Sequence, residues 1–289
     1  MLGALVRQEP LRALAHRLEE RLRRRALLAE DILPYDTHRF DRRTWVIKET
    51  TQGYRIWCSL DDRAISRPIL VDSYELPETR FIARTLRQGD RAVDAGANIG
   101  YHTLHFAKLV GAEGHIYAFE PIAYLADALC ASIDENGFLS RIDVYRSALD
   151  TKGGTARMRH APRTANFGGA HFSPKAPLPE FQIDEAVATV RLDDVIGNRP
   201  CHFIKLDVEG AEPRVIRGAR KTLETGRPVI LAELHDDQLR AVSDSTADDF
   251  IAQMAALGYR CSRLNPDGTR GGRLERYDDK KPINVAFDP

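Results

Sequence analysis

The chain has 289 residues, of which 43% are hydrophobic, so it can bury a large core, but no apolar run approaches the ~20 residues that cross a bilayer. Its 42 basic and 42 acidic residues leave a formal net charge of zero, which gives no support to nucleic acid or another polyanion as the main partner. The four scattered cysteines never stand at metal-ligand spacing, which predicts reduced, mostly buried thiols and a cytoplasmic protein.

Residues 1–72 are predicted to form an extension ahead of the main domain. Pro10 precedes leucines at helical spacing and a cluster of arginines, which predicts an amphipathic helix and leaves no apolar segment for a signal peptide. Such a helix could bind a membrane surface or mediate a homodimer, but neighbouring glutamates dilute its charge and favour packing on its own domain. Next, β-branched and aromatic residues from Thr44 to Leu60 surround Gln52-Gly53 and predict a β-hairpin.

The main domain, residues 73–289, is organised around the stretch from Ala92 to Gly100. A helix that follows Tyr74-Glu75 leads into it, and its short apolar strand ends in a tight turn before a second helix. This is the opening of a nucleotide-binding α/β fold, but its glycines have the spacing G-x-x-x-G and not the dinucleotide pattern G-x-G-x-x-G. Asp94 at the strand end would repel phosphate and suits a cationic ligand such as S-adenosylmethionine.

A second acidic residue ends the next predicted strand. Glu120 stands twenty residues after Gly100, where a carboxylate can accept hydrogen bonds from both ribose hydroxyls of a nucleoside. A helix then runs to Asn136-Gly137 and is followed by a strand at 142–145. Ser147, just beyond that strand, is a candidate for contact with adenine, although it could also be a plain strand-end serine.

Residues 157–183 break the regular alternation of strands and helices. They mix arginine, histidine, asparagine, glycine, aromatic residues and three prolines without a clear period. A long irregular segment inside a compact domain is typically functional or disordered. We expect it to form an acceptor-binding loop or lid that orders on binding; the alternative is a plain surface excursion.

The second informative block runs from Phe203 to Glu212. Its apolar strand ends at Asp207, with Lys205 before it and Glu209 after it, so acidic residues follow three strands that should share one sheet edge. Asp207, Glu209 and His235, which ends the next strand, are the candidate general bases. The carboxylates of Asp207 and Glu209 suit Mg²⁺, but no third ligand is evident, so no metal is predicted. Two further strands close the chain.

These motifs resemble the FkbM-type family of S-adenosylmethionine-dependent methyltransferases. The matching pieces lie at 93–100, 119–121, 192–194 and 204–212, and the resemblance covers roughly residues 74–289. It implies a class I methyltransferase fold, Rossmann-like, with a seven-stranded, mostly parallel sheet whose last strand is antiparallel and helices on both faces. It also implies O-methylation of a hydroxyl on a sugar, glycan or secondary metabolite, without naming the acceptor.

Together these observations assign candidate roles to named residues. The predicted cofactor-binding residues are Tyr74, Asp94, Gly96, Ala97, Asn98, Gly100, Glu120, Pro121, Ser147, Ala148 and Asp207. The predicted catalytic residues are Lys205, Asp207, Glu209 and His235. The rival functions are a non-catalytic S-adenosylmethionine-binding module, an N-methyltransferase and a dehydrogenase, the last disfavoured by Asp94 and by the missing glycine pattern.

Overall fold

The computed structural model describes residues 44–161, 168–172, 183–279 and 281–289. Within these residues no helix is both long and apolar enough to cross a membrane. The predicted helix near the N-terminus falls in residues 1–43, outside the described part of the chain.

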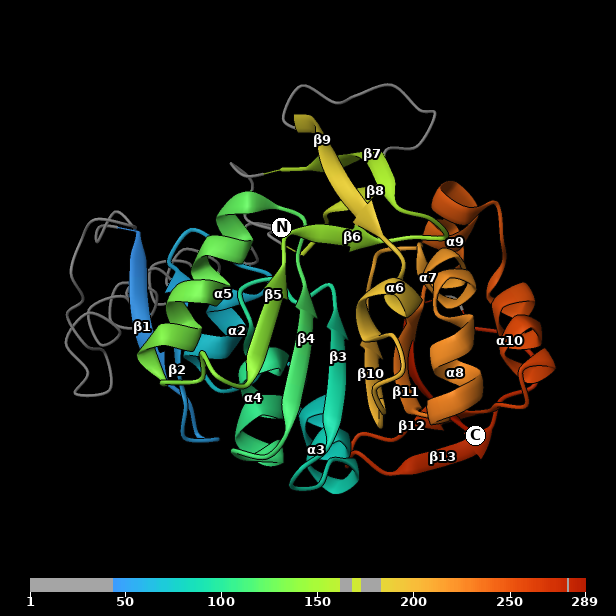
Figure 1. The fold of residues 1–289 in the computed structure, drawn as a ribbon, viewed down its shortest axis with the longest axis horizontal. Helices are drawn as coiled ribbons and strands as arrows, with labels where there is room; N and C mark the ends of the chain where they lie inside the picture. Colours follow the sequence, from blue (N-terminus) through green and yellow to red (C-terminus); the bar gives the residue numbers. More distant parts are fainter. Residues whose placement is uncertain (1–43, 162–167, 173–182, 280) are drawn as a thin grey trace, which may run out of the picture.

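A mixed central sheet forms the middle layer (Figure 1). Its strand order is β13-β12-β14-β11-β10-β3-β4-β5, in which β11, β10, β3, β4 and β5 are parallel and β14, β12 and β13 each pair antiparallel with their neighbour. The strands are β3 (Arg91–Ala95), β4 (His115–Phe119), β5 (Ile142–Tyr145), β10 (Phe203–Leu206), β11 (Val229–Leu234), β12 (Arg260–Leu264), β13 (Arg270–Arg273) and β14 (Ile283–Asp288). Strand order reverses between β3 and β10, and ligands bind at such a switch point.

The predicted count of seven strands is too low for the described residues, which place eight strands in this sheet. The additional strand is the edge strand β13, which a turn around Gly268 folds back onto β12. Its sequence Arg-Gly-Gly-Arg has no alternation of apolar and polar side chains, because an exposed edge strand has no face to bury.

Side chains on the parallel strands alternate between two cores. Along β3, Ala92 packs in one cluster and Val93 in the other, and along β4 Ile116 and Tyr117 divide in the same way. The first cluster is covered by α2 (Ser66–Leu70), α3 (Leu76–Thr85), α4 (Tyr101–Val110) and α5 (Ala123–Glu135). The second is covered by α6 (Leu192–Ile196), α7 (Glu212–Gly218), α8 (Arg220–Gly226), α9 (Asp236–Ser243) and α10 (Ala247–Ala256). Helices therefore cover both faces (Figure 1).

The predicted hairpin is present as β1 (Trp45–Glu49) and β2 (Arg55–Ser59). It packs on the main domain, since the backbone N–H of Trp57 donates to Ser132 Oγ at 3.0 Å and the Tyr54 hydroxyl donates to the Tyr101 carbonyl at 2.9 Å. Residues of β1 and β2 also share a hydrophobic cluster with α4 and α5. A boundary at residue 72 and a homodimer through the extension stay predictions.

A second, smaller sheet stands at the ends to which the β3, β4 and β5 arrows point (Figure 1). Its order is β6-β9-β7-β8, with β6 (Ser147–Leu149), β7 (Gly154–His160), β8 (His171–Phe172) and β9 (Ile183–Val190). The prediction of an irregular segment at 157–183 is wrong for residues 157–160, 171–172 and 183, which belong to β7, β8 and β9. Only the last part of β7 is buried, so its polar first half hides the strand pattern. Residues 162–167 and 173–182, the rest of the predicted lid, lie outside the described part.

Candidate functional site

Three cavities meet at the carboxyl ends of β3, β4 and β10, and each shares lining residues with another. The large cavity, of about 580 Å³, lies between the carboxyl ends of β3, β4 and β10 and the small sheet. The turn cavity, of about 280 Å³, lies beside the turn 96–99, and the β11 cavity, of about 260 Å³, lies beside β11. Asp207 lines all three, and Lys205 lines the turn and β11 cavities.

The turn after β3 needs glycine at position 96 for two reasons. Gly96 has a φ of +85°, and a Cβ added there would lie 1.9 Å from the carbonyl oxygen of Asp207. The turn also approaches β4, because the N–H groups of Gly96 and Ala97 donate to the Phe119 carbonyl at 3.1 and 3.0 Å. Glycine therefore brings the ends of β3, β4 and β10 close together.

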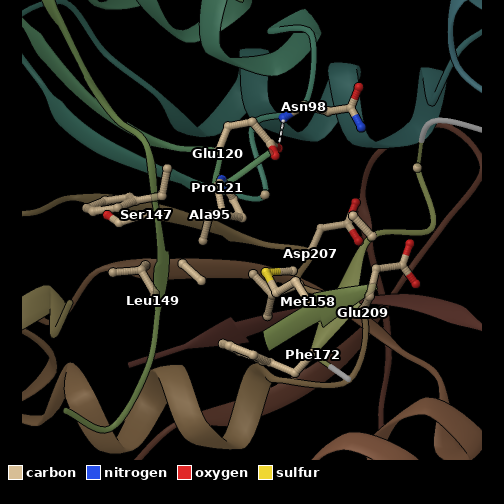
Figure 2. Close-up of a pocket in the computed structure, with 16 residues that line it drawn as sticks. Ala95, Asn98, Glu120, Pro121, Ser147, Leu149, Met158, Phe172, Asp207 and Glu209 are labelled. Carbon is tan, nitrogen blue, oxygen red and sulfur yellow. Dashed lines mark hydrogen bonds between the residues drawn. The ribbon is translucent and has the colours of Figure 1, made fainter. Parts of the chain in front are cut away.

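The Glu120 carboxylate lies between this turn and the start of α5. Its side chain is buried, with 4% of the residue exposed. One oxygen accepts the backbone N–H of Asn98 (Figure 2) and the other accepts that of Ile122, both at 2.8 Å. Burial raises the pKa of Glu120 to about 7, although the two backbone hydrogen bonds oppose this. Each carboxylate oxygen keeps a lone pair that can accept a further hydrogen bond.

Asp94 lines the turn cavity with an oxygen that lacks a partner. Thr103 Oγ1 donates to Asp94 Oδ2 at 2.6 Å, whereas the buried Oδ1 has no hydrogen-bond partner among the described residues. Burial raises the pKa of Asp94, and the nearby charge of Lys205 lowers it in part. A buried carboxylate oxygen without a partner is costly, so this site suits a ligand that brings a donor or a positive charge.

Lys205 and Glu75 extend this charge network between the two smaller cavities. Lys205 Nζ donates to Asp207 Oδ2 at 2.8 Å, and His102 Nε2 and Glu75 Oε2 are joined at 2.5 Å. Burial alone would lower the pKa of Lys205, but the carboxylates of Asp207, Glu75 and Asp94 outweigh it and raise that pKa. Burial would raise the pKa of Glu75, but Lys205 and His102 bring it down to about 2. Lys205 is therefore a permanent cation and does not act as a base.

Two further glutamates surround Asp207. Burial and the charge of Asp207 raise the pKa of Glu209 to about 9, and Gln238 Nε2 donates to the Glu209 side chain. The same two causes raise the pKa of Glu233, which lines the β11 cavity, to about 7. Glu209 is therefore a neutral carboxylic acid near pH 7, which makes it a hydrogen-bond donor and not a base. The described residues hold no group of three or more His, Cys, Asp or Glu placed to bind a metal ion.

The structure brings most of the predicted residues together. Ten of the predicted cofactor-binding residues line the large or the turn cavity, namely Tyr74, Asp94, Gly96, Ala97, Asn98, Glu120, Pro121, Ser147, Ala148 and Asp207. Gly100 is instead the N-cap of α4. Of the predicted catalytic residues, Lys205, Asp207 and Glu209 line a cavity, whereas His235 caps α9 and does not line these three.

Several residues that line the cavities are not among the predicted site residues. Glu75 follows the predicted Tyr74, but nothing in the local sequence shows that it shares a cavity with Lys205. Glu233 ends a strand like the other acids, so the same strand-end rule could have selected it. Met158 and Phe172 lie in the stretch expected to be irregular, and only the structure places them in the large cavity.

Comparison with known proteins identifies the family. The model of the methyltransferase FkbM domain matches residues 94–261, more than half of the chain. A 31-O-demethyl-FK506 methyltransferase, FkbM, from Streptomyces tacrolimicus is 30% identical over 201 residues, which cover 60% of this chain and 74% of that protein. The methyltransferase sdnD of Sordaria araneosa is 26% identical over 206 residues, which cover 62% and 75%.

Among solved structures, the methyltransferase FkbM from Methylobacillus flagellatus KT superposes with a TM-score of 0.46 at 16% identity. The superposition covers 70% of this chain but only 44% of that one, so this chain spans less than half of the crystallised protein. The family match and the Streptomyces relative carry the assignment. The chain belongs to the FkbM family of methyltransferases, and its cofactor is S-adenosylmethionine.

Proposed function

We propose that the protein transfers a methyl group to a hydroxyl of a small-molecule or glycan acceptor, such as a sugar or a secondary metabolite. The observation that carries this proposal is the position of Asp207, which lines all three cavities and pairs with Lys205. A group at the junction of a donor cavity and an acceptor cavity can act on both reactants.

The large and turn cavities suit the cofactor. Glu120 would accept hydrogen bonds from the ribose hydroxyls, and Pro121 with Ser147 would flank the adenine. The unpartnered Oδ1 of Asp94 would accept from the ammonium of the amino-acid end in the turn cavity. These residues fit the groups that S-adenosylmethionine carries, since carboxylates bind hydroxyl donors and cations through charge-assisted hydrogen bonds.

The β11 cavity suits the acceptor hydroxyl. Asp207 uses Oδ2 for Lys205, is 31% exposed, and has an Oδ1 without a hydrogen-bond partner among the described residues. When bound, S-adenosylmethionine supplies a methyl group on a sulfonium, which becomes a neutral thioether as the methyl leaves. Asp207 Oδ1 would take the proton of the acceptor hydroxyl while that oxygen bonds to the methyl carbon. Such a base increases the rate ~10²–10⁴-fold, and alignment of the reactants lowers the activation barrier by ~7–11 kcal/mol.

Two observations favour oxygen over nitrogen as the acceptor atom. The β11 cavity is lined by Glu75, Asp207 and Glu233 beside a single lysine, and carboxylates keep an amine protonated, without the lone pair that attack requires. In addition, the name of the Streptomyces relative specifies an oxygen as its methylation site. A non-catalytic binding module would not need the costly buried group of charges around Asp207.

The test is a transfer reaction with ¹³C-methyl S-adenosylmethionine and a panel of matched alcohols and amines. We expect S-adenosylhomocysteine to form together with a methyl ether, identified by the carbon shift of the product. Asp207→Asn should slow transfer ~10²-fold or more, and Asp237→Asn, an exposed change on α9, should not. Methyl groups found on nitrogen, or cofactor binding without transfer to any member, would contradict the proposal.

A further inference from the structure

The small sheet supplies one wall of the large cavity. Met158 from β7 and Phe172 from β8 line it, and both side chains are buried. In Figure 2 they lie below the cavity, whereas Glu120 and Asn98 lie above it. The wall therefore faces the strand-end residues that we assign to the adenosine half of the cofactor.

Phe172 is held in place from α7. The guanidinium carbon of Arg214 lies 4.3 Å from the centre of the Phe172 ring, a cation–π contact. Arg214 is in turn fixed by Asp150, because its Nε and Nη2 donate to the two carboxylate oxygens at 2.9 and 2.5 Å. A bidentate pair of this kind fixes orientation as well as distance.

Asp150 is itself firmly placed. It follows β6 directly, is buried, and accepts the Thr151 N–H at 2.6 Å. Burial would raise the pKa of Asp150, but the hydrogen bond from Arg214 lowers it, so the carboxylate is ionised near neutral pH. A Cβ added at Gly218 would lie 2.1 Å from the Asp150 carbonyl oxygen, so α7 packs directly on this turn. The Asp150–Arg214–Phe172 chain therefore connects α7 and the turn after β6 to the cavity wall.

We propose that Arg214 and Asp150 are positioning residues that hold Phe172 against the adenosine half of the cofactor. This inference rests on the cofactor placement proposed above. Phe172 would contribute to binding by packing on the nucleoside, and Arg214 would act only through Phe172. Neither Arg214 nor Asp150 lines the three cavities, so an effect of either on cofactor affinity must be indirect.

A double-mutant cycle on S-adenosylhomocysteine binding, measured by calorimetry on the full chain, tests this inference. Phe172→Ala should weaken binding about 10-fold or more, the scale of a base–aromatic contact. Arg214→Ala should weaken it by less, and the double variant should bind no more weakly than Phe172→Ala alone. Residues that act through one another are not additive, whereas a general structural loss at Arg214 would add to that at Phe172.

Arg217→Ala is the matched control, because Arg217 is an exposed arginine on the same helix. If Arg214→Ala unfolds the protein, Arg214→Lys and Phe172→Leu complete the cycle. Additive losses, or an unchanged affinity in Phe172→Ala, overturn the inference. A failure of the proposed cofactor placement is recognised separately, because Glu120→Ala would then leave S-adenosylhomocysteine binding unchanged.

Discussion

Replacement of Glu120 by alanine tests the proposed ribose contact most sharply. Two hydroxyls donating to a carboxylate contribute about 1.5–3 kcal/mol each, so both together contribute at most ~6 kcal/mol. Part of this is offset, because a carboxyl whose pKa is about 7 must be ionised first, which costs about 0.4 kcal/mol at pH 7. We therefore expect Glu120→Ala to weaken S-adenosylmethionine by ~2–5 kcal/mol, or ~30- to 5,000-fold.

The pH dependence of binding gives this prediction a second readout. A raised pKa favours the neutral acid in the free protein, whereas the ligand favours the anion. The affinity should therefore rise about tenfold from pH 6 to pH 8 as the carboxyl ionises. Glu120→Gln cannot ionise and should reduce this dependence, although its amide nitrogen must then face the backbone N–H of Asn98 or of Ile122.

Isothermal titration calorimetry in two buffers of different ionisation enthalpy measures both the affinity and the protons released. Glu113→Ala, an exposed change before β4, is the control. Thermal unfolding of each variant shows whether the turn after β3 survives the loss of the carboxylate. A folded Glu120→Ala protein with the wild-type dissociation constant would refute the ribose assignment.

Three further predictions address the turn, the chemistry and the pH dependence of stability. Gly96→Ala should destabilise the protein by more than ~2 kcal/mol in chemical denaturation, because its Cβ would overlap the Asp207 carbonyl. Gly89 has a similar φ of +82° but no atom within 4 Å of an added Cβ, so Gly89→Ala should cost about 1 kcal/mol. Equal losses in the two variants would contradict the steric argument. Asp207→Asn should keep cofactor affinity but lower turnover ~10²-fold or more, and His235→Ala should lower it less; the reverse order at saturating cofactor would make histidine the base. The pKa of Glu209 is about 9 in the folded protein against a usual 4.5, so between these values the folded state binds a proton that the unfolded state lacks, and stability falls as pH rises. Glutamine does not titrate, so the melting temperature of Glu209→Gln should increase relative to that of the wild type between pH 6 and pH 9. A difference in melting temperature that stays constant with pH would refute this.

The sequence predicts those parts of the site that depend on residues close together in the chain. Asp94 lies at the end of β3, and Glu120 and Asp207 directly follow β4 and β10. Because parallel strands end at one edge of the sheet, strand ends alone predict that these carboxylates converge. Glycine spacing likewise predicts the tight turn after β3. The actual reason for Gly96, its approach to the Asp207 carbonyl, depends on a strand more than a hundred residues later.

The rest of the site depends on tertiary placement. Glu75 lines the β11 cavity together with Lys205, whose charge lowers the pKa of Glu75. Its backbone, ahead of α3, is left-handed with φ of +40°, a conformation that a glutamate rarely adopts. Phe172 belongs to a strand of two residues, which is too short for a period to be recognised. Its role depends on Arg214, which the sequence places on an unremarkable helix.

The most direct test of the whole account is a crystal structure of the protein with S-adenosylhomocysteine. We expect the ribose hydroxyls on Glu120, the adenine between Pro121 and the Phe172 wall, and the sulfur directed toward Asp207. A nucleoside bound in the β11 cavity, or outside these three cavities, would contradict it.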